Sequence, residues 1–274
     1  MRFRRVVLGI GTLVDEQTLR AAAELAQSME LALLGLFVEE ADLFQLAALP
    51  FAAEVSVPSA RTRRLDPATM ALALRARSGE ARRALARRLE GATVPWDFTT
   101  VRGSALSAML EASTGSDLLV ASTRFGSGVD RGRERERALQ SLKECHRSLL
   151  LVDQAPPRAP VAAVIAPDAS IASVAPELGA LALHYGGPLT IILAGSASPE
   201  ADRLNDRGRA VLADLGIPTR LHRVAGMGAE TLQRELAAEP PGLIVLCGSA
   251  RSLDAAHAAL EPLAGALLLL PAPA

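Results

Sequence analysis

Short apolar runs alternate along the chain with longer stretches in which apolar residues recur at helical spacing. Runs such as "RVVLGIG" and "SLLLVD" are apolar almost throughout, as expected of strands covered on both faces of a sheet. This alternation is typical of β–α–β units around a parallel sheet. The first half is predicted to contain strands at Arg5–Gly11, Leu31–Val38, Trp96–Val101, Asp117–Ser122 and Ser148–Val152, and helices near Glu16–Met29, Pro67–Leu89, Ala105–Ser113 and Glu134–Cys145.

The stretch "DQAPPRAP", from Asp153 to Pro160, interrupts this pattern. Its prolines indicate a semi-rigid linker, which predicts one domain over residues 1–154 and a second over 160–274. The same order of elements then repeats. The second half is predicted to contain strands at Val161–Ala166, Leu189–Ala194, Thr219–Val224, Leu243–Cys247 and Ala266–Leu270, and helices near Ile171–Tyr185, Glu200–Leu215, Ala229–Ala237 and Ser252–Leu260.

The two halves also share local sequence. "VRGSALSAMLEASTGSDLLVAS" aligns loosely with "VAGMGAETLQRELAAEPPGLIVLCGS", which places Gly103 opposite Gly226. An ancestral duplication explains this match, and chance similarity between two α/β domains is the alternative.

One segment of the first half has no counterpart in the second. "EEADLFQLAALPFAAEVSVPSARTRRLDP" inserts about 25 residues, over roughly positions 40–66, where such connections usually have 2–6. It carries more apolar surface than a free loop tolerates, in Leu43, Phe44, Leu46, Leu49, Phe51 and Val55. We expect it to pack over the domain or across a dimer seam, with a lid over a pocket as the alternative.

Composition excludes several classes of partner. The formal net charge is −1 with no block of one sign, and aromatic residues make up 3% of the chain, which argues against nucleic acid and a membrane surface. Asp15 and Glu16 precede any small-residue cleavage site, so no signal peptide is expected. Cys145 and Cys247 lack the spacing of a zinc site or a disulfide framework. We therefore expect a cytoplasmic protein.

No catalytic constellation is recognisable. The four histidines (His146, His184, His222 and His257) lie in or beside four different predicted elements, without metal-ligand spacing. Neither a G-x-S-x-G elbow nor a G-x4-G-K-[ST] phosphate loop is present. We expect no catalytic residues and no metal site.

The tandem five-stranded halves and the stretch "RGSALSAMLEASTGSDLLVAS" resemble the universal stress protein family. The resemblance covers nearly the whole chain. It implies two flavodoxin-like, doubly wound α/β domains of five parallel strands each, in the order 3-2-1-4-5. It further implies that the halves pack about a pseudo-twofold axis through their last strands, "SLLLVD" and "ALLLLP".

Family members that bind ATP carry G-x2-G-x9-G-[ST] after the fourth strand and an aspartate after the first. Glycines there let backbone N–H groups approach the phosphates. In the first half, Gly11 stands where the aspartate is due, and Gly126 and Gly128 lack the required spacing. Arg124 could still hold a phosphate by its charge, or the glycines could simply permit a turn.

The second half keeps a different part of the pattern. Asp168 and Ser170 match the family's D-x-S, and Gly248 matches the first motif glycine. Arg251 replaces the second glycine, and Glu261-Pro262 stands where G-[ST] is due. Asp168 could equally serve only as a helix cap. The candidate nucleotide contacts are Asp168, Ser170, Gly248, Ser249, Arg251, Arg124, Gly126 and Gly128.

The resemblance implies a non-catalytic regulatory or interaction module in the stress response, with degenerate ATP motifs and no assured cofactor. The alternative is an adenine-nucleotide sensor that uses the second half. Its phosphates would have to be held by Arg251 or not at all, so AMP or adenosine is expected in preference to ATP. A third hypothesis is a weak nucleotide hydrolase that uses Asp130 or Asp254. The expected partner is the other half of the chain or a second copy.

Overall fold

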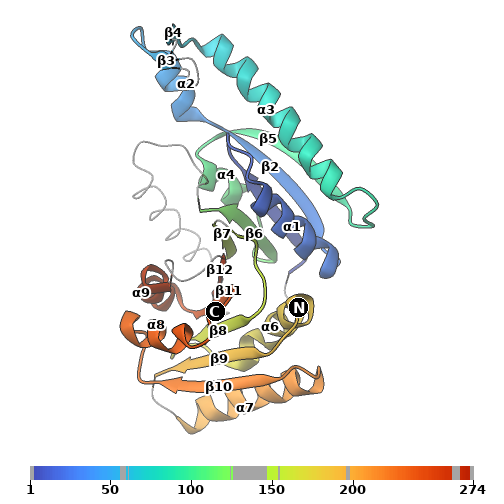
Figure 1. Cartoon of the computed structure of the whole chain (residues 1–274), viewed down its shortest axis with the longest axis vertical. Helices are drawn as coiled ribbons and strands as arrows, with labels where there is room; N and C mark the ends of the chain where they lie inside the picture. The colour runs from blue at the N-terminus through green and yellow to red at the C-terminus, as the bar shows by residue number, and fades with distance from the viewer. Residues whose placement is uncertain are drawn as a thin grey trace.

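The computed structural model describes residues 3–55, 60, 62–123, 125, 147–153, 155–195, 198–260 and 266–271, and its main sheet has ten strands (Figure 1). Five strands of the first half run in the order β5-β2-β1-β6-β7, all parallel. Numbered within the half, this is the predicted order 3-2-1-4-5. The elements are β1 (Arg5–Ile10), α1 (Glu16–Ser28), β2 (Ala32–Glu40), α3 (Pro67–Arg88), β5 (Trp96–Gly103), α4 (Ala105–Glu111), β6 (Asp117–Ser122) and β7 (Ser148–Val152). The predicted helix Glu134–Cys145 lies outside the described residues.

The second half repeats this arrangement. Its strands follow the order β10-β9-β8-β11-β12, again 3-2-1-4-5 within the half. The elements are β8 (Val161–Ile165), α6 (Ile171–Tyr185), β9 (Leu189–Ala194), α7 (Pro199–Asp214), β10 (Thr219–Val224), α8 (Ala229–Ala237), β11 (Leu243–Gly248), α9 (Ala250–Leu260) and β12 (Ala266–Pro271). The predicted fold class is therefore confirmed.

The two halves meet through their last strands, as the sequence predicts. Strand β7 pairs antiparallel with β12, in a register that sets Val152 opposite Ala266 and Leu149 opposite Leu269. Every residue of both strands is buried. The sheet therefore runs unbroken from one half into the other (Figure 1).

Helices cover both faces of the sheet because successive strand residues point to opposite sides. Val6 and Leu8 of β1 join the apolar layer beneath α1, α3, α6 and α7. Val7 between them joins the layer beneath α4, α8 and α9. Among the described residues, no helix is both long and apolar enough to cross a membrane.

The insertion forms a short helix and a hairpin beside α3, at the top of the view in Figure 1. These elements are α2 (Ala41–Ala47), β3 (Ala53–Val55) and β4 (Thr62–Arg64). On its inner side, Ala47 and Ala52 are buried, and the Arg102 guanidinium lies 3.7 Å from the centre of the Phe44 ring. Its outer side leaves four large apolar residues exposed, namely Leu46, Leu49, Phe51 and Val55. The insertion thus packs on the domain through only part of its apolar surface.

A pH dependence of stability is expected from His184 at the end of α6. Burial lowers the pKa of His184, and this effect outweighs the opposing influence of Glu24 in α1. The unfolded chain therefore takes up the proton first, so stability should fall as pH drops from about 7 towards 5. Urea unfolding should show a shallower decline over that range for His184→Gln than for the wild type. Equal declines would contradict the assignment to His184.

Candidate functional site

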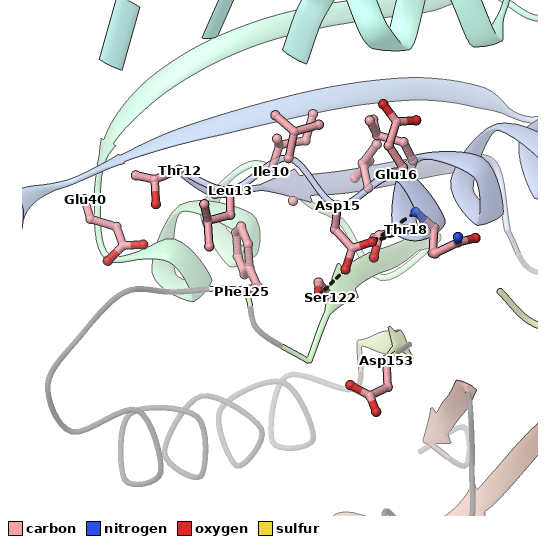
Figure 2. Close-up of a pocket in the computed structure, with 16 residues that line it drawn as sticks. Ile10, Thr12, Leu13, Asp15, Glu16, Thr18, Glu40, Ser122, Phe125 and Asp153 are labelled. Carbon is pink, nitrogen blue, oxygen red and sulfur yellow. Dashed lines mark hydrogen bonds between the residues drawn. The ribbon is translucent and has the colours of Figure 1, made fainter. Parts of the chain in front are cut away.

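A cavity of about 520 Å³ opens at the carboxyl ends of the first-half strands. We call it the switch-point cavity, because it lies where the strand order reverses between β1 and β6, the usual ligand position in open α/β sheets. The end of β1, the β1–α1 loop and the first turn of α1 form most of its wall. Glu40, Ser122, Phe125 and Asp153 complete the lining (Figure 2).

Asp15 is central to this site. It is the N-cap of α1, where its Oδ1 accepts hydrogen bonds from the backbone N–H groups of Gln17 (3.0 Å) and Thr18 (3.3 Å). Its Oδ2 accepts a bond of 2.8 Å from the hydroxyl of Ser122, at the end of β6 (Figure 2). One carboxylate thus ties the loop after the first strand to the end of the fourth.

Asp15 does not follow from the resemblance to universal stress proteins, because Gly11 stands at the position of the family's aspartate. The structure brings a carboxylate to this position from four residues later in the chain. The sequence does contain a signal for it, since an aspartate directly before a helix that begins with Glu16 is a typical N-cap. That signal indicates a helix start, and it says nothing about a cavity.

The described polar lining is acidic. Glu16 accepts a hydrogen bond from Arg88 at 3.1 Å, and Asp153 accepts one from the Thr123 hydroxyl at 2.6 Å. The strand order sets Glu40, at the end of β2, and Asp153, just after β7, on opposite sides of the cavity. None of the described lining residues is basic. Such a lining favours hydroxyl donors or cations over a chain of phosphates.

One wall of the cavity is apolar. A Cβ atom at Gly9 would lie 2.4 Å from Met109 Sδ and 2.8 Å from Phe125 Cζ, so any other residue would require these two side chains to move away from β1. Leu13, with 75% of its surface exposed, lines the cavity on the loop after β1. Leu13 and Phe125 thus give the cavity an apolar part to its wall, against which a ring system could pack.

In the second half, the structure brings three of the predicted residues together. Asp168 accepts hydrogen bonds from the Ser249 backbone N–H (3.1 Å), the Ser249 hydroxyl and the Ser252 hydroxyl (2.7 Å). A Cβ atom at Gly248 would lie 2.7 Å from Ala166 Cβ and 3.1 Å from Asp168 Oδ1. The absence of a side chain at Gly248 therefore leaves room for the Asp168 carboxylate and not for a phosphate.

Burial pushes the pKa of Asp168 upward, but the Ser249 and Ser252 hydrogen bonds outweigh it and hold the pKa below its usual value. The ionised carboxylate is already supplied with three donors. Asp168 thus joins the loop after the first strand to the end of the fourth, as Asp15 does in the first half. Both carboxylates are therefore structural ties, and Asp15 in addition lines the switch-point cavity.

The other predicted residues are spread out. Ser170 is buried at the N-cap of α6, where its carbonyl accepts a bond from the Ser173 hydroxyl. Arg251 is exposed in the first turn of α9. Arg124, Gly126 and Gly128 lie outside the described residues, as does Asp130. Within the described part of the chain, no three His, Cys, Asp or Glu side chains are placed to hold a metal ion.

Comparison with solved structures identifies this architecture. A universal stress protein from Archaeoglobus fulgidus superposes with a TM-score of 0.62 at 12% identity, covering 99% of this chain and 98% of that one. The fold is that of a tandem universal stress protein. A putative universal stress protein from Pseudomonas aeruginosa UCBPP-PA14 has a TM-score of 0.59 at 14% identity, with coverage of 98% and 94%. A functionally unknown protein from Pseudomonas aeruginosa PAO1 has a TM-score of 0.57 at 13% identity, with coverage of 98% and 93%.

The universal stress fold extends over both halves of these structures, and it confirms the resemblance inferred from the sequence. No family model and no curated protein matches the sequence. Because the identities are low, the comparisons establish the fold and do not identify a ligand.

Proposed function

We propose that this protein is a non-catalytic regulatory binding protein of the universal stress fold, and that its ligand is an adenine nucleoside or nucleoside monophosphate in the switch-point cavity. The observation that carries the proposal is the composition of that cavity, with carboxylates and an apolar ring surface at the carboxyl ends of the strands. The site is thus proposed in the first half, whereas the sequence motifs favour the second.

The chemistry of a nucleoside suits this lining. Ribose hydroxyls are donors, and hydrogen bonds from a hydroxyl to a carboxylate such as Asp15 or Asp153 are among the strong ones. A purine ring would lie against Phe125 and Leu13, since aromatic and apolar surfaces bind base faces without reading their edges. A triphosphate in the same space would face Glu16 and the other carboxylates at close range.

Calorimetric titration with adenosine, AMP and ATP tests this assignment. We expect adenosine and AMP to bind, ATP to bind no more tightly than AMP, and the nucleotides to remain chemically unchanged after prolonged incubation. Asp15→Asn should weaken adenosine binding by about tenfold, the loss expected for a charge-assisted hydrogen bond. Asparagine also caps helices well, so this variant should fold.

Asp168→Asn is the matched control, because Asp168 also joins the loop after the first strand of its half to the end of the fourth. It should leave adenosine affinity within about twofold of the wild type. Weakened binding in Asp168→Asn alone would move the site to the second half. Release of phosphate from ATP by the wild type would contradict a non-catalytic role.

Protein recognition is the second candidate function. It is favoured by the exposed apolar side chains of the insertion, among which Phe51 is 80% exposed and Val55 is 60% exposed. Failure of adenosine, AMP and ATP to bind the wild type would favour this candidate.

A further inference from the structure

A second cavity, of about 300 Å³, shares a lining residue, Thr12, with the switch-point cavity. We call it the insertion cavity, because the insertion and α3 build it. The corresponding connection in the second half is too short for such an insertion, since β9 ends at Ala194 and α7 begins at Pro199.

The two cavities have opposite charge. Arg63 from β4 and Arg77 from α3 line the insertion cavity, together with Thr69 and apolar side chains, and its described lining contains no carboxylate. The switch-point cavity has carboxylates and no described basic residue. A ligand with one anionic end would therefore be oriented by the pair of cavities, with that end towards α3.

Arg77 is the side chain best placed to receive an anion. Its Nη1 donates a hydrogen bond of 3.1 Å to the Thr12 carbonyl, which holds the guanidinium at the junction of the two cavities. A guanidinium has five N–H donors, and within the described residues this is the one hydrogen bond that the Arg77 side chain makes. The remaining donors match the planar, two-point binding of a phosphate.

The carboxylate at the start of α3 is already engaged. Asp66 caps α3 by accepting hydrogen bonds from the Thr69 backbone N–H (2.9 Å) and hydroxyl (2.6 Å). These bonds, with a smaller contribution from Arg63, lower the pKa of Asp66 and keep it ionised. Asp66 therefore offsets the charge of Arg63, and Arg77 supplies the positive charge that remains in the cavity.

We propose that the insertion cavity binds the phosphate of a nucleoside monophosphate through Arg77, while the nucleoside occupies the switch-point cavity. The assignment of the nucleoside rests on the proposed function, but the anion site can be tested by itself. Phosphate binding would then involve α3 and the insertion beside it, in place of the glycine-rich turn, whose motif is broken.

The decisive experiment compares AMP with adenosine by calorimetric titration of the full chain. In the wild type, AMP should bind about tenfold or more tightly than adenosine. Arg77→Gln should reduce this ratio to less than about threefold while leaving adenosine affinity unchanged. Arg77→Lys should retain part of the advantage, because it keeps the charge but loses the two-point geometry.

Arg75→Gln is the matched control. Arg75 is an exposed arginine two residues away on the same helix, outside the described lining of the cavity. Its substitution should leave the ratio of AMP to adenosine affinity unchanged. Because Arg77 is itself exposed, both variants should fold.

The outcomes separate the two proposals. If adenosine and AMP bind equally, or if the advantage of AMP survives in Arg77→Gln, the phosphate site is overturned and the proposed function stands. If neither adenosine nor AMP binds, the proposed function fails, and thermal unfolding in millimolar inorganic phosphate then decides the anion site. Stabilisation that is lost in Arg77→Gln supports it, and no stabilisation of the wild type overturns it.

Discussion

Replacing Gly208 with alanine should destabilise the protein by about 3 kcal/mol, because the added methyl group has no space. Its Cβ would lie 2.5 Å from the Ala172 backbone N and 2.6 Å from the Ile171 carbonyl carbon. Both atoms are backbone at the start of α6, so relief requires moving α7 away from α6. That movement would also strain the hydrogen bond from the Ile171 N–H to the buried Asn205 side chain (2.9 Å).

Gly79→Ala is the control for this prediction. Gly79 is also inside a helix, but the nearest atom to an added Cβ is the flexible end of Arg83, at 3.4 Å. Alanine favours the helical backbone, so this variant should gain about 0.5–1 kcal/mol. Urea unfolding of the two variants measures both effects. A loss below about 1 kcal/mol for Gly208→Ala would show that α6 and α7 separate easily.

The second large effect is expected for Asp117→Ala, with a loss of about 3 kcal/mol in the free energy of unfolding. Asp117 is 3% exposed at the start of β6. Its carboxylate accepts hydrogen bonds from Arg5 Nη2 (2.7 Å) and Nε (3.3 Å) and from the Thr114 N–H (2.7 Å). Removing it leaves the half-buried guanidinium of Arg5 without its counter-charge.

The exposed pair Arg20–Glu24 on α1 provides the comparison. Its N···O distance is also 2.7 Å, but both side chains are more than a third exposed. Glu24→Ala should therefore change stability by less than about 0.5 kcal/mol. Similar losses for Asp117→Ala and Glu24→Ala in urea unfolding would show that burial does not determine the strength of these pairs.

The sheet could be predicted from the sequence because its strands are strongly marked. The runs "SLLLV" and "ALLLLP" contain a single polar residue, Ser148, as expected of strands covered on both faces. The structure pairs the two strands at the junction of the halves. The strand order followed from the family resemblance. Alternation of strand and helix by itself does not specify which strands are neighbours.

The candidate site could be predicted only in part. Asp168, Gly248 and Ser249 do come together, yet the sequence could not show that the carboxylate takes its donors from Ser249 and Ser252. Asp15 was hidden because it is the last of the five residues between β1 and α1, whereas Asp168 is the third of the five between β8 and α6. The roles of Arg124, Gly126 and Gly128 stay predictions.

Arg77 illustrates a different difficulty. It lies in the interior of a long helix among several other exposed arginines, so its sequence context is that of a solvated face. Its position beside Thr12 depends on how α3 crosses the β1–α1 loop, 65 residues away in the chain. Such a contact becomes visible only in three dimensions.

The antiparallel pairing of β7 and β12 has a consequence for how the two halves can diverge. Both crevices belong to one polypeptide, so a mutation changes one of them and leaves the other as it was. In a symmetric pair of single-domain chains, the same mutation would appear in both crevices at once. The covalent arrangement thus allows Asp168 and its serines to change independently of the cavity beside Asp15.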